Sequence, residues 1–540
     1  MESFQYGRDF TGWDVGSGDW KCLTQMIYPR VSSAAEKFLK LLQTCCKTVV
    51  CEKNYIDLDY RAGYSRFYYL RHHDTERRCT RLHFFSRNLT ESDLHDATDE
   101  VAGGYLGYSV LRPLPDYRLG RTIFSEKLLP EGRDKTKSYL TCKANYRVNL
   151  AGNDFEVTGA PWMQQDTLVS ACASIAIWVA SWHMSHKHWP EFRRYDTAEI
   201  TDLATQDNLS TGRSMPSEGL YPDQMMLGLN LMGYEPLPYD PSTADEARNR
   251  CYYYIESGIP VIFGLYFPGI GGHAVTGVGH TLDENYSTEG KKPRAWEDSV
   301  DSGTGILEFW ENSQFVPAFV VQDDAGGPFR FLEIFDYNDD WNKCFSEKLQ
   351  QKVAECARQW RCIAVLDRGT SLEQICFLTY VIVPLPLGVT LDGRAAEMRA
   401  LSLLQAWYAD TDRQPRSPLV VRTFLQLSNA VKRSCTKRDM PPYIALNIRR
   451  HLMSKWVWVT EFADLEELKA RKLVFGQVIQ DCASHANSPD FFDLLLFNIP
   501  DPPTLILVHP DGTDNWEDIG AYGSYKMFLR DMAESKVAHP

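Results

Sequence analysis

The sequence predicts a multidomain α+β protein. Its 540 residues exceed what one hydrophobic core usually organises, and a prior of about 150 residues per domain suggests three or four domains. Apolar residues make up 44% of the chain and aromatic residues 12%, which is ample material for buried cores. Segments with helical periodicity alternate with strand-like segments rich in β-branched and aromatic residues. These observations favour several α+β domains over a single domain or a disordered chain.

The amino-terminal domain is expected to span residues 1–150, with a helix leading into a sheet. Apolar positions recur at helical spacing over residues 31–50, whereas residues 55–70 and 78–87 are aromatic-rich and strand-like. Residues 103–124, GGYLGYSVLRPLPDYRLGRTIF, alternate aromatic or β-branched residues with small and turn residues. This mixture is typical of an α+β domain.

The central domain is expected to span residues 151–387. An apolar helix comes first, further helices follow, and several short strands rich in Val, Ile and Phe come last, a layering typical of α+β folds. Residues 281–314 are polar and rich in glycine and charge. We therefore expect an exposed loop or insertion there, which could cover or flank a cleft.

The carboxy-terminal domain is expected to span residues 388–540 and to be a smaller α+β unit. Residues 395–408 and 419–432 show helical periodicity. The strand-like segments are 456–462, 473–479 and 504–509.

Composition and charge exclude several classes of partner. The formal net charge of −14 opposes binding to a phosphate backbone, so nucleic acid is not expected. Residues 1–19 lack the apolar core of a secretory signal, and no apolar stretch reaches the roughly 20 residues of a membrane span. The 14 cysteines show neither disulfide-scaffold spacing nor a CxxC pair for zinc. We therefore expect a soluble, cytoplasmic protein with reduced thiols, no cofactor, no metal and no membrane partner.

One cysteine stands out because it begins a predicted helix. Residues 162–182, WMQQDTLVSACASIAIWVASW, change from polar residues to an apolar run that starts at Cys172. Free N–H groups and the positive end of the helix dipole stabilise a thiolate at such a position. A cysteine of this kind is otherwise a small core residue, so the nucleophile hypothesis depends on an accompanying base.

A histidine near the start of a later strand is the candidate base. Residues 269–280, GIGGHAVTGVGH, follow a predicted buried strand at 257–267, and the glycines before His273 would allow close approach of a substrate backbone. The imidazole would form an ion pair with the thiolate and later protonate the leaving group. His280, also flanked by glycine, competes for this role. The cluster of His183, His186 and His188 more simply ends a helix than binds a metal.

Two carboxylates end another apolar strand, in the segment FVPAFVVQDDAGGPF. One of them could orient the imidazole, and Asp323 is preferred to Asp324. Adjacent strand residues point to opposite faces, so the sequence alone does not say which carboxylate faces the histidine. Without the cysteine and the histidine, both would be interpreted as turn residues before Gly326 and Gly327.

The order of these residues resembles the papain-like cysteine peptidase superfamily, particularly its bacterial C39-like branch. In that branch a helical phrase such as GLYPDQMMLGLNLMGYE, here residues 219–235, precedes a GIPVI strand, and HAV follows. The resemblance covers residues 164–329. It implies a papain-like fold for the central domain and a catalytic triad of Cys172, His273 and Asp323.

The same resemblance implies a glutamine that helps to form the oxyanion hole. Members of the family usually carry it six residues before the cysteine, where this chain has Asp166. Gln165 is the preferred donor here and Gln164 the second, because one extra loop residue would restore the register. Ala173 also replaces the glycine that commonly follows the cysteine.

The function that the resemblance implies is that of a thiol hydrolase, a cysteine protease or isopeptidase. It would act on a protein or peptide substrate through a thioester acyl-enzyme. The same apparatus serves deamidases and acyltransferases. The displaced glutamine and the two large flanking domains motivate an alternative, a catalytically degenerate protease fold that serves as a binding or assembly module. The flanking domains could bind a protein partner on either reading.

Overall fold

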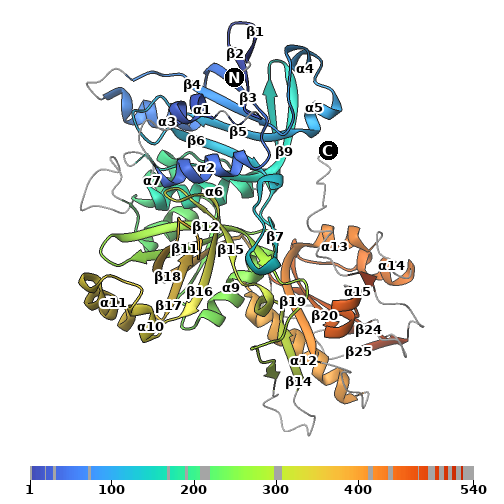
Figure 1. Ribbon diagram of the computed structural model, residues 1–540. Helices are drawn as coiled ribbons and strands as arrows, with labels where there is room; N and C mark the ends of the chain where they lie inside the picture. Colours follow the sequence, from blue (N-terminus) through green and yellow to red (C-terminus); the bar gives the residue numbers. More distant parts are fainter. Residues whose placement is uncertain are drawn as a thin grey trace.

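The computed structural model of the chain contains three large β-sheets, each accompanied by helices (Figure 1). The amino-terminal unit lies above the central unit in this view, and the carboxy-terminal unit lies beside the central one. The α+β class with several sheets is therefore confirmed. The described residues are 3–16, 18, 20–27, 32–70, 75–166, 171–188, 192–206, 219–296, 307–410, 418–435, 442–471, 473–483, 493–497, 504–508, 514–518 and 525–526.

The amino-terminal unit is an antiparallel sheet with the strand order β1-β2-β3-β4-β5-β6-β9-β8. Helix α2 lies between this sheet and the central unit, because Phe38 packs on Phe84 and Trp162 while Lys37 lies against Gly327. The strands are β1 (Ser3–Tyr6), β2 (Phe10–Asp14), β3 (Thr48–Tyr55), β4 (Cys79–Phe85), β5 (Tyr105–Leu111), β6 (Leu119–Ser125), β8 (Ala144–Leu150) and β9 (Asn153–Trp162). The helices are α1 (Lys21–Ile27), α2 (Ser33–Gln43), α3 (Leu58–Arg66), α4 (Glu91–Asp96) and α5 (Asp99–Gly103).

The strand-like reading of residues 55–70 is wrong, because this segment forms α3 and a short 3-10 turn, η1 (Tyr68–Leu70). Asp57 caps α3 by accepting a hydrogen bond from the Tyr60 amide, and Tyr60 stacks on Tyr68. The aromatic residues therefore cover one side of a helix rather than a strand.

The expected boundary at residue 150 falls inside the β8–β9 hairpin. Strand β9 pairs with both β6 and β8, so it completes the amino-terminal sheet and the unit extends to Trp162. A hairpin cannot be divided between two domains without breaking its ladder of hydrogen bonds.

The central unit is a sheet that closes on itself. Its strand order is β10-β18-β11-β12-β15-β16-β17, and the long strand β18 pairs with β11 and also with β17. The strands are β7 (Lys137–Tyr139), which pairs with β12, β10 (Tyr234–Tyr239), β11 (Val261–Phe267), β12 (Gly271–Leu282), β15 (Phe319–Asp323), β16 (Gly327–Asp336), β17 (Cys362–Leu366) and β18 (Gln374–Pro386). The helices are α6 (Cys172–Lys187), α7 (Thr197–Ala204), α8 (Pro222–Leu231), α9 (Ala244–Glu256), α10 (Asp339–Asn342) and α11 (Glu347–Gln359).

Helix α6 is buried along almost its whole length. Its apolar side chains include Ile177 and Trp178, and the Thr276 hydroxyl of β12 donates a hydrogen bond to the Ala176 carbonyl at 2.9 Å. A helix that is apolar on all sides belongs in the interior of a protein. This packing fixes α6 against the strand that carries His273.

The carboxy-terminal unit is built on a third sheet, with the order β13-β14-β19-β20-β22-β23-β24-β25. The expected helix at 395–408 and the expected strands at 456–462 and 504–509 correspond to α12 (Gly393–Asp410), β20 (Trp456–Asp464) and β24 (Thr504–Val508), whereas the strand expected at 473–479 is divided between β21 (Leu473–Val474) and β22 (Gly476–Asp481). The strands are β13 (Arg294–Trp296), β14 (Leu307–Glu311), β19 (Leu419–Leu427), β20 (Trp456–Asp464), β22 (Gly476–Asp481), β23 (Asp493–Phe497), β24 (Thr504–Val508) and β25 (Asp514–Asp518), with β21 (Leu473–Val474) and β26 (Tyr525–Lys526) as a separate pair. The helices are α12 (Gly393–Asp410), α13 (Ser428–Ser434), α14 (Pro442–Arg450) and α15 (Leu465–Arg471).

The segment expected as an exposed insertion, residues 281–314, contributes two strands to this third sheet. Strand β14 pairs in parallel with β19, and its side chains Leu307 and Phe309 are buried in a core with Leu401. Parallel pairing needs a partner far along the chain, so local polarity could not reveal it. Part of the predicted insertion is therefore an integral piece of the carboxy-terminal unit.

The helical reading of residues 419–432 is also wrong, because residues 419–427 form strand β19 and only the following turns are helical. Strand β19 lies between β14 and β20, and its first seven residues are all buried. A strand buried on both faces has no period of two, so its apolar run resembles that of a helix.

A buried network of charges joins the carboxy-terminal unit to the central one. Arg422 of β19 donates to Glu256 of α9 at 2.7 Å and to Glu461 of β20 at 2.7 Å. Burial opposes ionisation of Glu256, but Arg422 and His280 lower the pKa of Glu256 to about 2. We call Arg422, Glu256, Glu461 and His280 the Arg422 network.

In the described part of the chain, no helix is long and apolar enough to cross a membrane.

Candidate active site

Cys172 is the first residue of α6. The preceding residue, Ala171, has extended backbone angles (φ −89°, ψ 164°), so the chain enters the helix directly before the thiol. The cysteine is partly exposed, whereas most of the other cysteines in the chain are buried. A partly exposed thiol at a helix start can meet a substrate and also benefits from the helix dipole.

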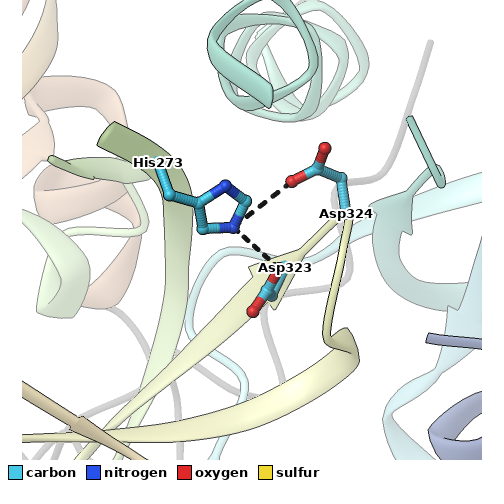
Figure 2. A group of neighbouring side chains, drawn as sticks. All are labelled: His273, Asp323 and Asp324. Atoms are coloured by element: carbon cyan, nitrogen blue, oxygen red, sulfur yellow. Dashed lines mark hydrogen bonds and ion pairs between the residues drawn. The ribbon is translucent and has the colours of Figure 1, made fainter. Parts of the chain in front are cut away.

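His273 lies near the start of β12 and joins the cysteine to two carboxylates. Its Nε2 atom is 2.9 Å from Oδ1 of Asp323 and 3.6 Å from Oδ1 of Asp324 (Figure 2). The Cys172 side chain is also among the groups that raise the pKa of His273, which puts the thiol within reach of the imidazole. Since Nε2 is engaged by the carboxylates, Nδ1 is the ring nitrogen left for the sulfur.

The charges around His273 favour the imidazolium. Burial by itself would lower the pKa of His273, but attraction and hydrogen bonding to Asp323, the hydrogen bond with Cys172 and the charge of Asp324 together raise it well above its ordinary value. An imidazolium next to a cysteine is the arrangement that holds a sulfur as thiolate.

Asp323 is held rigidly at the end of β15. Its Oδ1 accepts hydrogen bonds from the amides of Ala325 and Gly326, and its Oδ2 lies 2.7 Å from Nη1 of Arg330. Burial disfavours its charged form, yet His273, Arg330 and the backbone amides lower the pKa of Asp323 below its ordinary value. This carboxylate is therefore ionised and oriented towards the imidazole.

Asp324 also turns towards the same imidazole, but its carboxylate lies farther from Nε2 than that of Asp323. Asp323 ends the strand and Asp324 begins the turn, where side chains no longer alternate strictly between faces. Burial, together with the adjacent Asp323, raises the pKa of Asp324 to about 7, although His273 opposes the shift. Asp323 is the closer and better anchored partner of His273, and Asp324 is a buried carboxyl whose surroundings favour the protonated form.

The two candidate glutamines lie in different surroundings. Gln164 is buried, and its side chain is used within the amino-terminal unit: Nε2 donates to the Ser32 hydroxyl at 2.9 Å and Oε1 accepts from the Leu119 amide. Gln165 is half-buried. Gln164 is thus occupied elsewhere, and Gln165 stays the candidate oxyanion donor.

His280, the competing base, is engaged by another carboxylate. It is fully buried, and its Nε2 is 2.6 Å from Glu256 in the Arg422 network. The histidines at the end of α6 bind backbone carbonyls, His183 that of Gly258 and His186 that of Trp182. These three side chains therefore serve packing and contacts between units.

Three residues that bear on the site carried no signal in the sequence. Arg330 anchors Asp323, and the Trp162 indole of β9 donates a hydrogen bond to the Asp323 carbonyl at 2.8 Å. Tyr380 of β18 lies over Gly264, which has no side chain there, and burial together with the charge of Cys172 raises the pKa of Tyr380 to about 12. Arg330 comes from the strand next to that of Asp323, whereas Trp162 is remote in sequence from Asp323 and Tyr380 from Cys172, so only the tertiary structure could place these two beside the site.

The cluster of His273, Asp323 and Asp324 also invites comparison with a metal site, since its ligand atoms lie within 4.8 Å of one another. Asp323, however, already accepts hydrogen bonds from His273, Ala325 and Gly326 and pairs with Arg330. A bound cation would have to displace these donors and tolerate the guanidinium. The arrangement suits an imidazole oriented by a carboxylate better than a metal ion.

Replacing Asp324 with asparagine is expected to raise the melting temperature at alkaline pH and to change it little in acid. The pKa of Asp324 is raised from 3.8 to about 7, so the folded protein holds a proton that the unfolded chain loses earlier. The stability linked to this proton is present at low pH and is lost as pH rises through about 7. Asparagine cannot ionise, and thermal unfolding across this pH range measures the difference.

Asp323→Asn is the matched control because its expected effect has the opposite sign. The pKa of Asp323 is lowered on folding, so its contribution is present at neutral pH and is lost only as pH falls into strong acid. This variant should therefore be less stable than the wild type at neutral pH. Equal changes in the melting temperature of both variants at every pH would contradict the opposite pKa shifts of Asp323 and Asp324.

Comparison of the chain with protein-family models, with curated proteins and with solved structures gives no match.

Proposed function

We propose that this chain is a papain-like cysteine hydrolase, a peptidase or isopeptidase that acts through Cys172, His273 and Asp323. The observation that carries the proposal is one imidazole shared between a thiol at a helix start and an anchored carboxylate. This is the relation of nucleophile, base and orienting group found in triads on unrelated folds. A protein or peptide is the proposed substrate, because a thioester chemistry of this type cleaves amide bonds.

The proposed reaction has two stages. The Cys172 thiolate attacks the carbonyl carbon, the C–S bond forms, and the tetrahedral oxyanion takes hydrogen bonds from the Cys172 amide and from Gln165. The intermediate collapses as His273 gives its proton to the leaving amine, and a thioester remains. Water then attacks the thioester, His273 takes one proton from it, and the carboxylic acid leaves as the thiolate re-forms.

Labelling with iodoacetamide tests the nucleophile. We expect Cys172 to be alkylated at least about tenfold faster than the exposed Cys22 and Cys344 at about pH 6, because ordinary thiols are hardly ionised there. Peptide mapping by mass spectrometry gives the rate for each cysteine. The fast site should vanish in Cys172→Ala.

The two exposed cysteines serve as internal controls in the same sample. A Cys172 rate equal to theirs would count against catalysis and would favour the alternative of a binding or assembly module. If Cys172 reacts fast, comparison of cell lysates treated with wild type and Cys172→Ala, read by new peptide amino termini, would identify the bond that is cleaved.

A further inference from the structure

Two segments that the proposed reaction uses both contact the start of α2, a helix of the amino-terminal unit. The first segment, residues 164–166, precedes the nucleophile and contains the candidate oxyanion donor Gln165. The second is the turn at residues 323–327, which carries the triad carboxylate. They lie on opposite sides of Cys172 in sequence, and neither is adjacent to α2 along the chain.

Consecutive serines at the start of α2 contact both segments. Ser32 caps the helix, and its hydroxyl accepts a hydrogen bond from Nε2 of Gln164 at 2.9 Å. The Ser33 hydroxyl donates to the Ala325 carbonyl at 2.8 Å. One end of one helix thus touches the oxyanion segment and the turn of the triad acid.

The contact of α2 with the turn is close enough to exclude larger residues. A side chain at Gly327, whose φ is +113°, would meet Cβ of Lys37 at 2.6 Å and the Ala34 carbonyl at 3.3 Å. Glycine is therefore required both for the backbone angle and for the approach of the helix.

A chain of buried charges leads from α2 to the triad acid. Lys37 pairs with Asp367 at 3.4 Å, Asp367 with Arg330 at 2.8 Å, and Arg330 with Asp323 at 2.7 Å. Arg330 and Asp367 are each at most 2% exposed, so these pairs are little screened by solvent. The amino-terminal unit therefore touches the acid turn through hydrogen bonds, packing and charge.

We infer that Ser32 and Ser33 are positioning residues for the proposed hydrolase and that the amino-terminal unit, through the start of α2, completes its active site. This inference rests on the proposed function. Ser33 fixes the turn whose amides orient Asp323, and Ser32 fixes the residue next to Gln165. The amino-terminal unit is then not a detachable substrate-binding module but a part of the catalytic scaffold.

The test uses the full chain with Ser32→Gly and Ser33→Ala combined. Glycine still allows a helix cap, whereas it removes the hydroxyl that holds Gln164. Each of the two segments loses one hydrogen bond to a serine hydroxyl, which opposes its local opening. Hydrogen exchange at the amides of Gln164, Ala325 and Gly326 should therefore become about two- to tenfold faster. Alkylation of Cys172 at about pH 6 should slow by a similar factor.

Two further variants separate positioning from general stability. Ser32→Thr with Ser33→Thr keeps both hydroxyls and should restore exchange and alkylation. Ser92→Ala changes an exposed serine of α4 and should alter neither. Unchanged exchange at the three amides in the Gly/Ala variant overturns the inference while leaving the proposed function intact. Slow alkylation of Cys172 already in the wild type overturns the proposed function, and the inference with it.

Discussion

Replacing His273 with alanine is expected to slow alkylation of Cys172 by about a hundredfold at about pH 6. An isolated thiol is only roughly 0.3% ionised there, whereas a thiol paired with an imidazolium reacts as thiolate. The raised pKa of His273 keeps the imidazole charged through neutral pH, so the pair persists across this range. The rate measurement by mass spectrometry described for the wild type gives the ratio directly.

The slower alkylation of Cys172 should result from removal of the imidazole and not from unfolding of the variant. His273 is 13% exposed and borders the surface, so the alanine variant should keep its fold, which its melting temperature will show. Asp323→Asn retains the imidazole but weakens its orientation, and it should fall between wild type and His273→Ala. An alkylation rate in His273→Ala equal to that of the wild type would exclude His273 as the partner of Cys172.

Replacing Arg422 with alanine is expected to destabilise the protein by about 3–5 kcal/mol, because removing one partner leaves buried charges uncompensated. Arg422 is 1% exposed and lies between Glu256 and Glu461, which are both buried as well. His280 would remain as a partner of Glu256, whereas Glu461 would lose its contact with the guanidinium. The free energy of unfolding, from denaturant titration, measures the change.

The same variant should loosen the connection between two units. Arg422 links β19 to α9, so its loss is expected to separate unfolding of the carboxy-terminal unit from that of the central one into two transitions. Arg368→Ala is the matched control, since Arg368 forms a half-exposed pair with Glu333 at 3.3 Å and such surface pairs contribute at most about 1 kcal/mol. Equal destabilisation by both variants would argue against the network.

The sequence predicted those features of this protein that depend on short stretches of chain. The change from polar to apolar residues at Cys172 marks the start of α6, and the glycines before His273 mark the turn into β12. Helix α12 and strands β20 and β24 were likewise predicted from local periodicity. Such features are set by capping, backbone freedom and side-chain period, all of which act within a few residues.

Local sequence patterns gave wrong secondary-structure predictions where the burial of a segment depends on partners distant in sequence. The apolar run of β19 had a helical appearance because the strand is buried on both faces; residues 307–311 pair with one of its edges. The polar stretch before that strand was expected to be an exposed insertion, although the segment ends in the third sheet. Aromatic residues at 55–70 suggested strands, although Asp57 caps a helix there.

By itself the sequence determined the α+β class and the order of a cysteine at a helix start, a histidine after a glycine turn and carboxylates after a strand. Only the tertiary structure decided that Asp323 rather than Asp324 is the anchored partner of His273, that His280 belongs to the Arg422 network, and that Gln164 is held by Ser32. The physical reason is that these choices depend on side-chain contacts with other elements. Arg330 of the adjacent strand β16 holds Asp323, whereas α2 and β19 are remote in sequence from the residues that they hold and meet them only through packing.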